Sequence, residues 1–218
     1  MTINFKHFYL IVDTETTGAQ TVADFGAVVV DRHGKVFDEL GVLVSGEFGE
    51  NPMHWALGNP KTTERKYRGL LATGHRMLAT VPAINRWLAR IRRQYNPVLT
   101  AYCLGFDFGK CANTDIDLAQ FDQRFCLRNA AKIIVQTPEY EAWCHENDAF
   151  TPSGRLSEKA DHVAQFVDPT LPPEPHTALE DARDYENPIL HRIIHLPKTK
   201  LEILAQGAGK SPSTKWML

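Results

Sequence analysis

Two carboxylates that stand two residues apart, at the end of an apolar run, constrain the fold of this chain more than any other feature. The run 7–12 is rich in aromatic and β-branched residues, which favours a strand buried on both faces. Because side chains alternate along a strand, we expect Asp13 and Glu15 to point to the same side. Gly18 then supplies the backbone freedom that a tight turn needs.

The paired acids have two possible explanations. Two like charges at the end of a buried strand repel each other and are costly to desolvate. A hard divalent cation, which prefers oxygen ligands, is the simplest compensation. Alternatively, both acids are turn residues at a solvated strand end, since turns favour Asp and Thr. The pattern Asp-x-Glu alone leaves both interpretations open.

Length and composition narrow the class of protein. The 218 residues suit one large domain or one domain with extensions, and 43% hydrophobic with 23% charged residues is ordinary for a globular protein. A net charge of −2 argues against a protein that simply coats nucleic acid, but not against an enzyme with an acidic metal site. Four cysteines without a Cys-x-x-Cys pair, and no expected secretory leader, predict a cytoplasmic location. No apolar run approaches the roughly 18 residues of a membrane span, so no membrane partner is expected.

The first half of the chain predicts an antiparallel meander followed by an irregular stretch. Strands are expected at 23–30 and 36–45, with a turn signal between them. The stretch 46–80 is interrupted by Gly, Asn and Pro. It contains a cluster of five basic residues: Lys61, Arg65, Lys66, Arg68 and Arg76. This cluster is either a solvated loop with a short helix or a phosphate-contacting lip beside an active site.

The second half predicts a helical layer around one more strand. A helix is expected over 82–95, followed by a parallel strand over 97–102. Further helices are predicted at 108–113, 127–135, 140–146 and 157–166. A proline-rich loop, 169–175, then leads to a last helix, which Pro188 should kink or break. We expect one domain over 1–195 and a weakly structured tail over 196–218.

Three motifs along the chain resemble those of a known enzyme family. They are Asp-x-Glu-Thr-Thr-Gly from Asp13, Phe-Asp at Asp107, and His-x-x-x-x-Asp from His176 to Asp181. In this order they resemble the motifs of the DEDDh 3′→5′ exonucleases, which include the proofreading subunit of bacterial DNA polymerase III, RNase T and oligoribonuclease. The resemblance covers roughly residues 8–194. It implies an α/β, RNase H-like fold, with a mixed five-stranded sheet of three antiparallel strands and then parallel strands, flanked by helices.

The resemblance also implies a set of site residues. Four acids would hold two divalent ions, Mg²⁺ or Mn²⁺: Asp13, Glu15, Asp107 and Asp181. His176 would be the general base that takes a proton from the attacking water. Thr16 and Thr17 are candidates for contacts to the 3′ end, or else ordinary turn residues. Where the family commonly has His-Asn before Phe-Asp, this chain has Tyr102 and Cys103, while the metal ligand itself is present.

The function implied is metal-dependent release of nucleoside 5′-monophosphates from single-stranded 3′ ends, with DNA slightly favoured over RNA. An exoribonuclease that trims RNA ends is the alternative within the enzyme class, and the 2′-OH is what would separate the two substrates. A catalytically silent module that binds nucleic acid or a partner with the same fold is the alternative outside it. A homodimer, or a protein partner that docks through the tail from Leu196, is also open.

Overall fold

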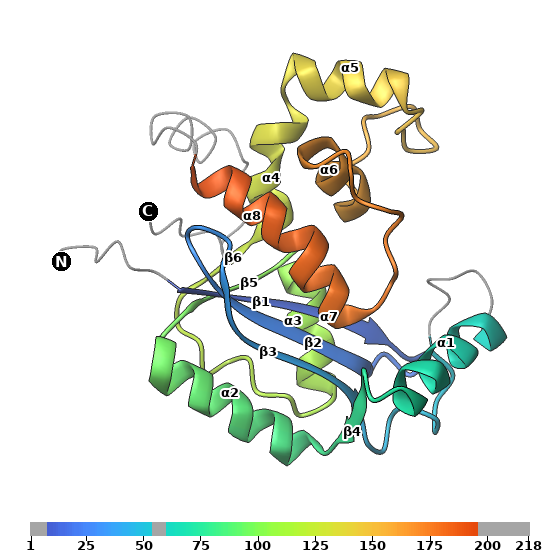
Figure 1. Ribbon diagram of the computed structural model, residues 1–218, viewed down its shortest axis with the longest axis vertical. Coiled ribbons are helices and arrows are strands. Elements are labelled where there is room, and N and C mark those ends of the chain that lie inside the picture. Colours follow the sequence, from blue (N-terminus) through green and yellow to red (C-terminus); the bar gives the residue numbers. More distant parts are fainter. Residues whose placement is uncertain (1–7, 54–59, 196–218) are drawn as a thin grey trace.

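The computed structural model describes residues 8–53 and 60–195, which form an α/β fold with a six-stranded mixed sheet flanked by helices (Figure 1). The strand order is β4-β3-β2-β1-β5-β6. The antiparallel meander is confirmed, and it consists of β1 (Phe8–Thr16), β2 (Val22–Asp31) and β3 (Val36–Val44). The parallel strand expected next is also confirmed, as β5 (Val98–Ala101) beside β1.

The expected strand number of five is wrong, because the described residues already form a sheet of six strands. β6 (Arg124–Cys126) pairs with β5, and β4 (Met77–Ala79) adds a parallel strand to the β3 edge. Each has three residues, too few for a hydrophobic period to be visible in the sequence. Two of the three β4 side chains, Met77 and Leu78, are exposed, which removes the burial signal as well. The stretch 46–80 is therefore less irregular than predicted, since it also contains α1 (Pro60–Ala72).

The helices agree with the predicted segments to within a few residues. They are α2 (Val81–Tyr95), α3 (Leu104–Asn113), α4 (Leu127–Val135), α5 (Pro138–Glu146) and α6 (Ala160–Val167). The largest difference is at α3, which begins four residues before the predicted start at residue 108. Gly105 favours a loop in the sequence, but in the structure it lies inside the first turn of α3. As a result, Asp107 lies in the first turn of a helix.

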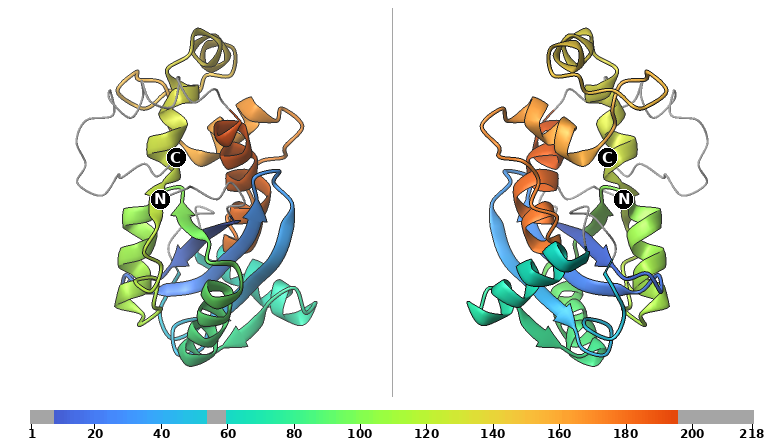
Figure 2. Two further views of the ribbon diagram at one scale, coloured as in Figure 1. Left: turned by 90° about the vertical axis from the view of Figure 1, so that its left-hand side faces the viewer. Right: turned by 90° about the vertical axis from the view of Figure 1, so that its right-hand side faces the viewer.

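The sheet separates two hydrophobic cores, and alternation along β1 assigns its side chains to them. Leu10 and Val12 pack on one face with residues of α2 and α3. Ile11 packs on the other face with residues of α4, α6 and α8 (Asn187–Ile194). The views in Figure 2 show the sheet between these two helical layers. Asp13 and Glu15 continue the odd-numbered series of Ile11, so they belong to the α8 face.

The last helical region changes its type along its length. It passes from α7 (Ala178–Glu180) through a π-helix, η1 (Asp181–Glu186), into α8. Pro188 lies at the first positions of α8, where a missing backbone N–H costs little. The interruption that we predicted at Pro188 is thus a π-helical turn just before it. π-Helical turns are rare and are frequent at functional sites.

Two facing glycines allow this region to lie directly on the sheet. Gly26 of β2 pairs with Gly41 of β3. A Cβ at Gly26 would lie 2.1 Å from the carbonyl carbon of Ala178, and one at Gly41 would lie 2.7 Å from Leu179 Cδ2. Gly26 is also paired with Asp13. Because Gly26 has no side chain, the start of α7 can lie next to the acidic end of β1.

Replacing Gly26 by Ala should therefore destabilise the fold strongly. The added methyl group would meet backbone atoms, which cannot rotate away as a side chain does. We expect the free energy of unfolding to fall by about 3 kcal/mol, which is the upper end of the usual cost of adding a methylene to a well-packed site. Urea unfolding measures it, with Gly69→Ala in α1 as the control, because no atom lies within 4 Å of a Cβ there. Equal stabilities of the two variants would contradict the close approach.

Two expectations concern other parts of the chain. The predicted tail, 196–218, lies outside the described residues. Within the described part of the chain, no helix is both long and apolar enough to cross a membrane.

Candidate metal centre

The end of β1 and the start of α3 bring three acids together. Asp13 and Glu15 are half-buried on β1, on the face that α7 and η1 cover. Asp107 is buried in the first turn of α3, and its Oδ1 accepts a hydrogen bond of 2.8 Å from Thr14 Oγ1. Thr14, which stands between Asp13 and Glu15, thus holds the carboxylate of Asp107 in place. The resemblance of the first two motifs implies this convergence.

The α7–η1 region adds the fourth acid and the histidine. Asp181 is buried, and its Oδ1 has no hydrogen-bond donor among the described residues. Ligand atoms of Glu15, His176 and Asp181 all lie within 4.8 Å of one another. His176 has a backbone φ of 52°, which is uncommon for a residue other than glycine and is found at functional sites. All five residues singled out by the motifs therefore come from elements that meet at one place.

The acids of this centre resist ionisation. Burial, and then the charges of Glu186, Asp107, Asp181 and Glu15, raise the pKa of Asp13 well above its usual range. Burial, followed by nearby acids, raises the pKa of Glu15 to about 8 and that of Asp181 to about 9. Burial raises the pKa of Asp107 to about 7, although hydrogen bonds from Thr14 oppose this.

These observations fit a divalent cation. A group of buried acids that repel one another, with one carboxylate oxygen lacking any described donor, has the ligand chemistry that Mg²⁺ and Mn²⁺ prefer. Glu15 and Asp181 are already close enough to share an ion, with His176 beside them. Asp13 and Asp107 lie near enough for Asp107 to raise the pKa of Asp13, so they could complete a larger set of ligands.

The raised pKa values predict how stability depends on pH when no divalent ion is present. The pKa values of Glu15, Asp107 and Asp181 in the folded protein, about 8, 7 and 9, lie above their ordinary values of 4.5, 3.8 and 3.8. Between these limits the folded protein binds more protons than the unfolded chain. Its stability should therefore fall as the pH rises from about 5 to 9.

Thermal unfolding in EDTA across this pH range measures the effect. We expect the melting temperature to fall by several degrees, since 1 kcal/mol corresponds to about 2–4 °C for a chain of this size. Mg²⁺ or Mn²⁺ should restore it most strongly at the alkaline end, because an ion that binds the folded state stabilises it. A melting temperature that does not change with pH, with or without the ion, would contradict these electrostatics.

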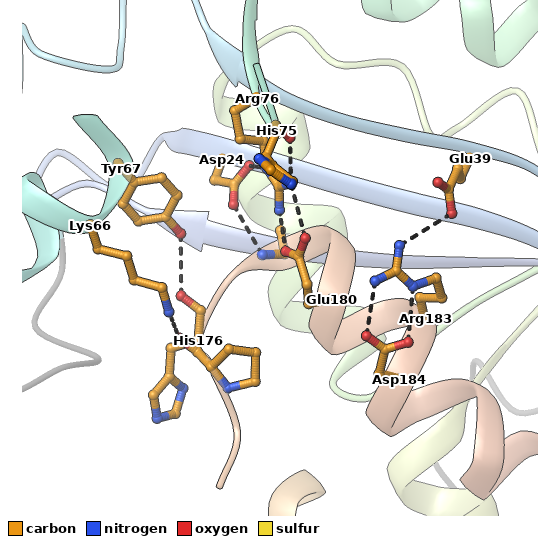
Figure 3. A network of polar contacts seen from close by, with 12 residues as sticks. Asp24, Glu39, Lys66, Tyr67, His75, Arg76, His176, Glu180, Arg183 and Asp184 are labelled. Carbon is orange, nitrogen blue, oxygen red and sulfur yellow. Dashed lines mark hydrogen bonds and ion pairs between the residues drawn. The ribbon is translucent and has the colours of Figure 1, made fainter. Parts of the chain in front are cut away.

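The histidine loop is held by α1 (Figure 3). Lys66 Nζ donates a hydrogen bond to the carbonyl oxygen of Pro175, and Tyr67 Oη donates one of 3.3 Å to that of His176. His176 Nδ1 lies 3.6 Å from a carboxylate oxygen of Glu174. Burial, and then Lys66 and Lys159, lower the pKa of His176 against an opposing effect of Asp161. His176 is thus neutral at pH 7 and able to accept a proton.

The basic cluster of the stretch 46–80 divides into separate roles. Arg76 is buried and pairs with Asp24 and Glu180, so it does not belong to a phosphate-contacting lip. Arg68 is exposed and pairs with Glu64 within α1. The Arg65 side chain is exposed, and that of Lys61 lies outside the described residues. Lys66 lies near enough to the acids for its charge to lower the pKa values of Glu15 and Asp181.

The two threonines after Glu15 are buried, Thr16 as the last residue of β1 and Thr17 directly after it. Thr17 is fully buried, and its hydroxyl lies 2.7 Å from that of Thr21, which in turn donates a hydrogen bond to Glu47. This hydroxyl therefore stabilises the turn. Thr16 is also buried, where the register of β1 and β2 shifts. A role for either threonine at a substrate's 3′ end stays a prediction.

Sequence reasoning missed a fifth acid, Glu186. It is buried, and its Oε2 accepts a hydrogen bond of 3.1 Å from the backbone N–H of Tyr102 at the end of β5. It is also the nearby charge with the largest effect on the pKa of Asp13. In a regular α-helix, residues five apart do not share a face, but the wider π-helical turn aligns Glu186 with Asp181. Pro188 was the only sequence signal that the helix is irregular here.

Comparison with known proteins adds no assignment. No family model matches this sequence, and no curated protein has significant similarity to it. The resemblance to the DEDDh exonucleases therefore rests on the three motifs, and the activity it implies remains a proposal.

Proposed function

We propose that this protein is a metal-dependent 3′→5′ exonuclease that hydrolyses single-stranded nucleic acid, with DNA as the favoured substrate. The observation that carries the proposal is the convergence of four acids and one histidine from three distant segments. Asp13 and Glu15 come from β1, Asp107 comes from α3, and the last segment supplies His176 from the loop before α7 and Asp181 from η1. Their order along the chain is that of the DEDDh motifs.

The arrangement of the sheet supports an RNase H-like fold. Without β4, the remaining strand order is β3-β2-β1-β5-β6, with three antiparallel strands followed by two parallel ones. This is the five-stranded pattern that the resemblance implies. In this proposal, β4 and α1 are additions at the β3 edge that belong to the stretch 46–80.

The residues of the centre suit hydrolysis of a phosphodiester. Asp13, Glu15, Asp107 and Asp181 would hold two divalent ions, Mg²⁺ or Mn²⁺. Such ions stabilise the charge on the attacking and leaving oxygens of an in-line displacement at phosphorus. His176, neutral at pH 7, would accept the proton of the attacking water. Lys66 lies close enough to the acids to pair with a phosphate of the bound strand.

The test is cleavage of matched single-stranded DNA and RNA oligomers, labelled at either the 5′ or the 3′ end. With Mg²⁺ or Mn²⁺, a 5′ label should give a ladder of shortened products, and a 3′ label should appear at once in a mononucleotide. EDTA should stop both reactions. If RNA is cleaved faster than DNA, RNA is the favoured substrate. The absence of cleavage of either oligomer would favour a silent binding module and contradict the proposal.

A further inference from the structure

The Arg76 side chain is held inside the protein between two acids. All of its atoms are buried, as are those of the Asp24 side chain. Arg76 Nε donates to Asp24 Oδ1 at 3.1 Å, while Nη1 and Nη2 donate to the two carboxylate oxygens of Glu180 at 3.2 and 2.5 Å. Nη1 also donates to the carbonyl oxygen of His75 at 3.0 Å. Most donors of the guanidinium are thus engaged, in a geometry that a lysine could not reproduce.

This ion-pair network joins three segments of the chain (Figure 3). Asp24 belongs to β2, Arg76 directly precedes β4, and Glu180 ends α7. Asp24 uses its second oxygen, Oδ2, to accept a hydrogen bond of 3.0 Å from the backbone N–H of Ala178. Asp24 and Arg76 therefore contact the short helix α7 at both of its ends.

The position of α7 determines where His176 and Asp181 lie. Asp181 follows Glu180 directly, and His176 precedes Ala178 by two residues. Gly26 and Gly41 leave the space in which α7 lies, and a Cβ at Gly41 would be only 3.1 Å from Arg76 Cζ. The guanidinium thus lies in the same hollow as α7. None of the three motifs includes Arg76 or Asp24.

We propose that Arg76, together with Asp24, is a positioning residue that sets the location of Asp181 and His176 relative to the acids of β1. This inference rests on the proposed function for its catalytic consequence. Asp24 is also paired directly with Glu15 across β1 and β2. A single buried network therefore links the backbone of the last motif to the strand that carries the first.

The first test compares Arg76→Lys with the wild type. Lysine keeps the positive charge but loses the fork that contacts both acids. We expect amide hydrogen exchange over residues 177–181 to be at least about tenfold faster, because opening of α7 becomes easier. The dissociation constant for Mn²⁺ should rise by roughly 10–100-fold, as for other partners that orient metal ligands. We expect kcat to fall by a similar factor, with KM nearly unchanged.

A charge-neutral variant separates positioning from stability. Arg76→Met combined with Asp24→Asn and Glu180→Gln removes all three charges of the network together. Such replacements are often neutral or stabilising for the fold, so the variant serves if Arg76→Lys fails to fold. If Arg76 positions the site, this variant should unfold at a temperature near that of the wild type and still bind Mn²⁺ weakly. Arg183→Met is the matched control, since Arg183 pairs with Glu39 and Asp184 on the outside of η1.

The outcomes distinguish this inference from the proposed function. Wild-type hydrogen exchange, Mn²⁺ affinity and kcat in both the lysine and the charge-neutral variant would overturn the positioning role. A wild-type protein that binds Mn²⁺ but cleaves no oligomer would overturn the proposed function. In that case, faster exchange and weaker Mn²⁺ binding in the two variants would still support the role of Arg76.

Discussion

Asp13→Asn should abolish metal-dependent turnover and, at the same time, make the metal-free protein more stable. Asn has nearly the same shape as Asp but carries no charge, so the metal site loses a carboxylate at its centre. Metal ions supply several kcal/mol of transition-state stabilisation, and each 1.4 kcal/mol is worth tenfold in rate. We therefore expect a fall in kcat of at least about 10³-fold and a clearly weaker binding of Mn²⁺.

The gain in stability has an electrostatic cause. In the metal-free protein, Asp13 is surrounded by four acids that raise its pKa, together with burial. Because Asn needs no proton to stay neutral, it avoids the free-energy cost of this raised pKa, and we expect about 1 kcal/mol of added stability at pH 8. Calorimetric Mn²⁺ titration and thermal unfolding in EDTA measure the two effects. Asp122→Asn is the control, because the Asp122 side chain is 84% exposed. Unchanged Mn²⁺ binding by Asp13→Asn would contradict the assignment.

His176→Ala should lower kcat by roughly 10²–10⁴-fold, the usual contribution of a general base. Metal binding should persist, because the four carboxylates stay in place. The variant also distinguishes a general base from a metal ligand. A ring nitrogen of His176 lies within 4.8 Å of carboxylate oxygens of Glu15 and Asp181, so the geometry allows both roles. A loss of Mn²⁺ affinity as large as the loss of kcat would assign His176 as a ligand and contradict the role of base.

The pH dependence gives a second readout of the same residue. Burial lowers the pKa of His176 below its ordinary 6.5, so with Mn²⁺ at a concentration that saturates the carboxylates the wild-type rate should fall only at acidic pH. In His176→Ala, this fall should disappear from the single-turnover rate. His145→Ala is the matched control, since His145 is exposed at the end of α5. Equal rates for His176→Ala and the wild type at every pH would remove the histidine from the mechanism.

The sequence predicted those features that depend on neighbouring residues. The alternation along β1 was enough to place Asp13 and Glu15 on one face, and the apolar spacing of α2 was enough to locate its bounds within one residue. That Asp107 and Asp181 belong with the acids of β1 was implied by the resemblance of the motifs, and in the structure both lie close enough to raise the pKa of Asp13. The shared face of the two β1 acids and the bounds of α2 need only the periods of strands and helices.

Features that depend on contacts between distant segments were not visible. Glu186 joins the centre from a π-helical turn, and Arg76 is buried where Gly26 and Gly41 let α7 approach the sheet. In the sequence, Arg76 belongs to a cluster of basic residues, which is usually solvated. β4 escaped prediction because it is short and two of its three side chains are exposed. In each case a tertiary contact overrides the local pattern.

The most direct test of the central claim is a crystal structure of the protein with Mn²⁺ and a short single-stranded oligomer, using the anomalous signal of manganese. We predict two Mn²⁺ peaks among Asp13, Glu15, Asp107 and Asp181, with the 3′-terminal phosphodiester beside them and His176 near its phosphorus. A structure with the oligomer bound elsewhere, or with no manganese between these four carboxylates, would contradict a two-metal exonuclease centre.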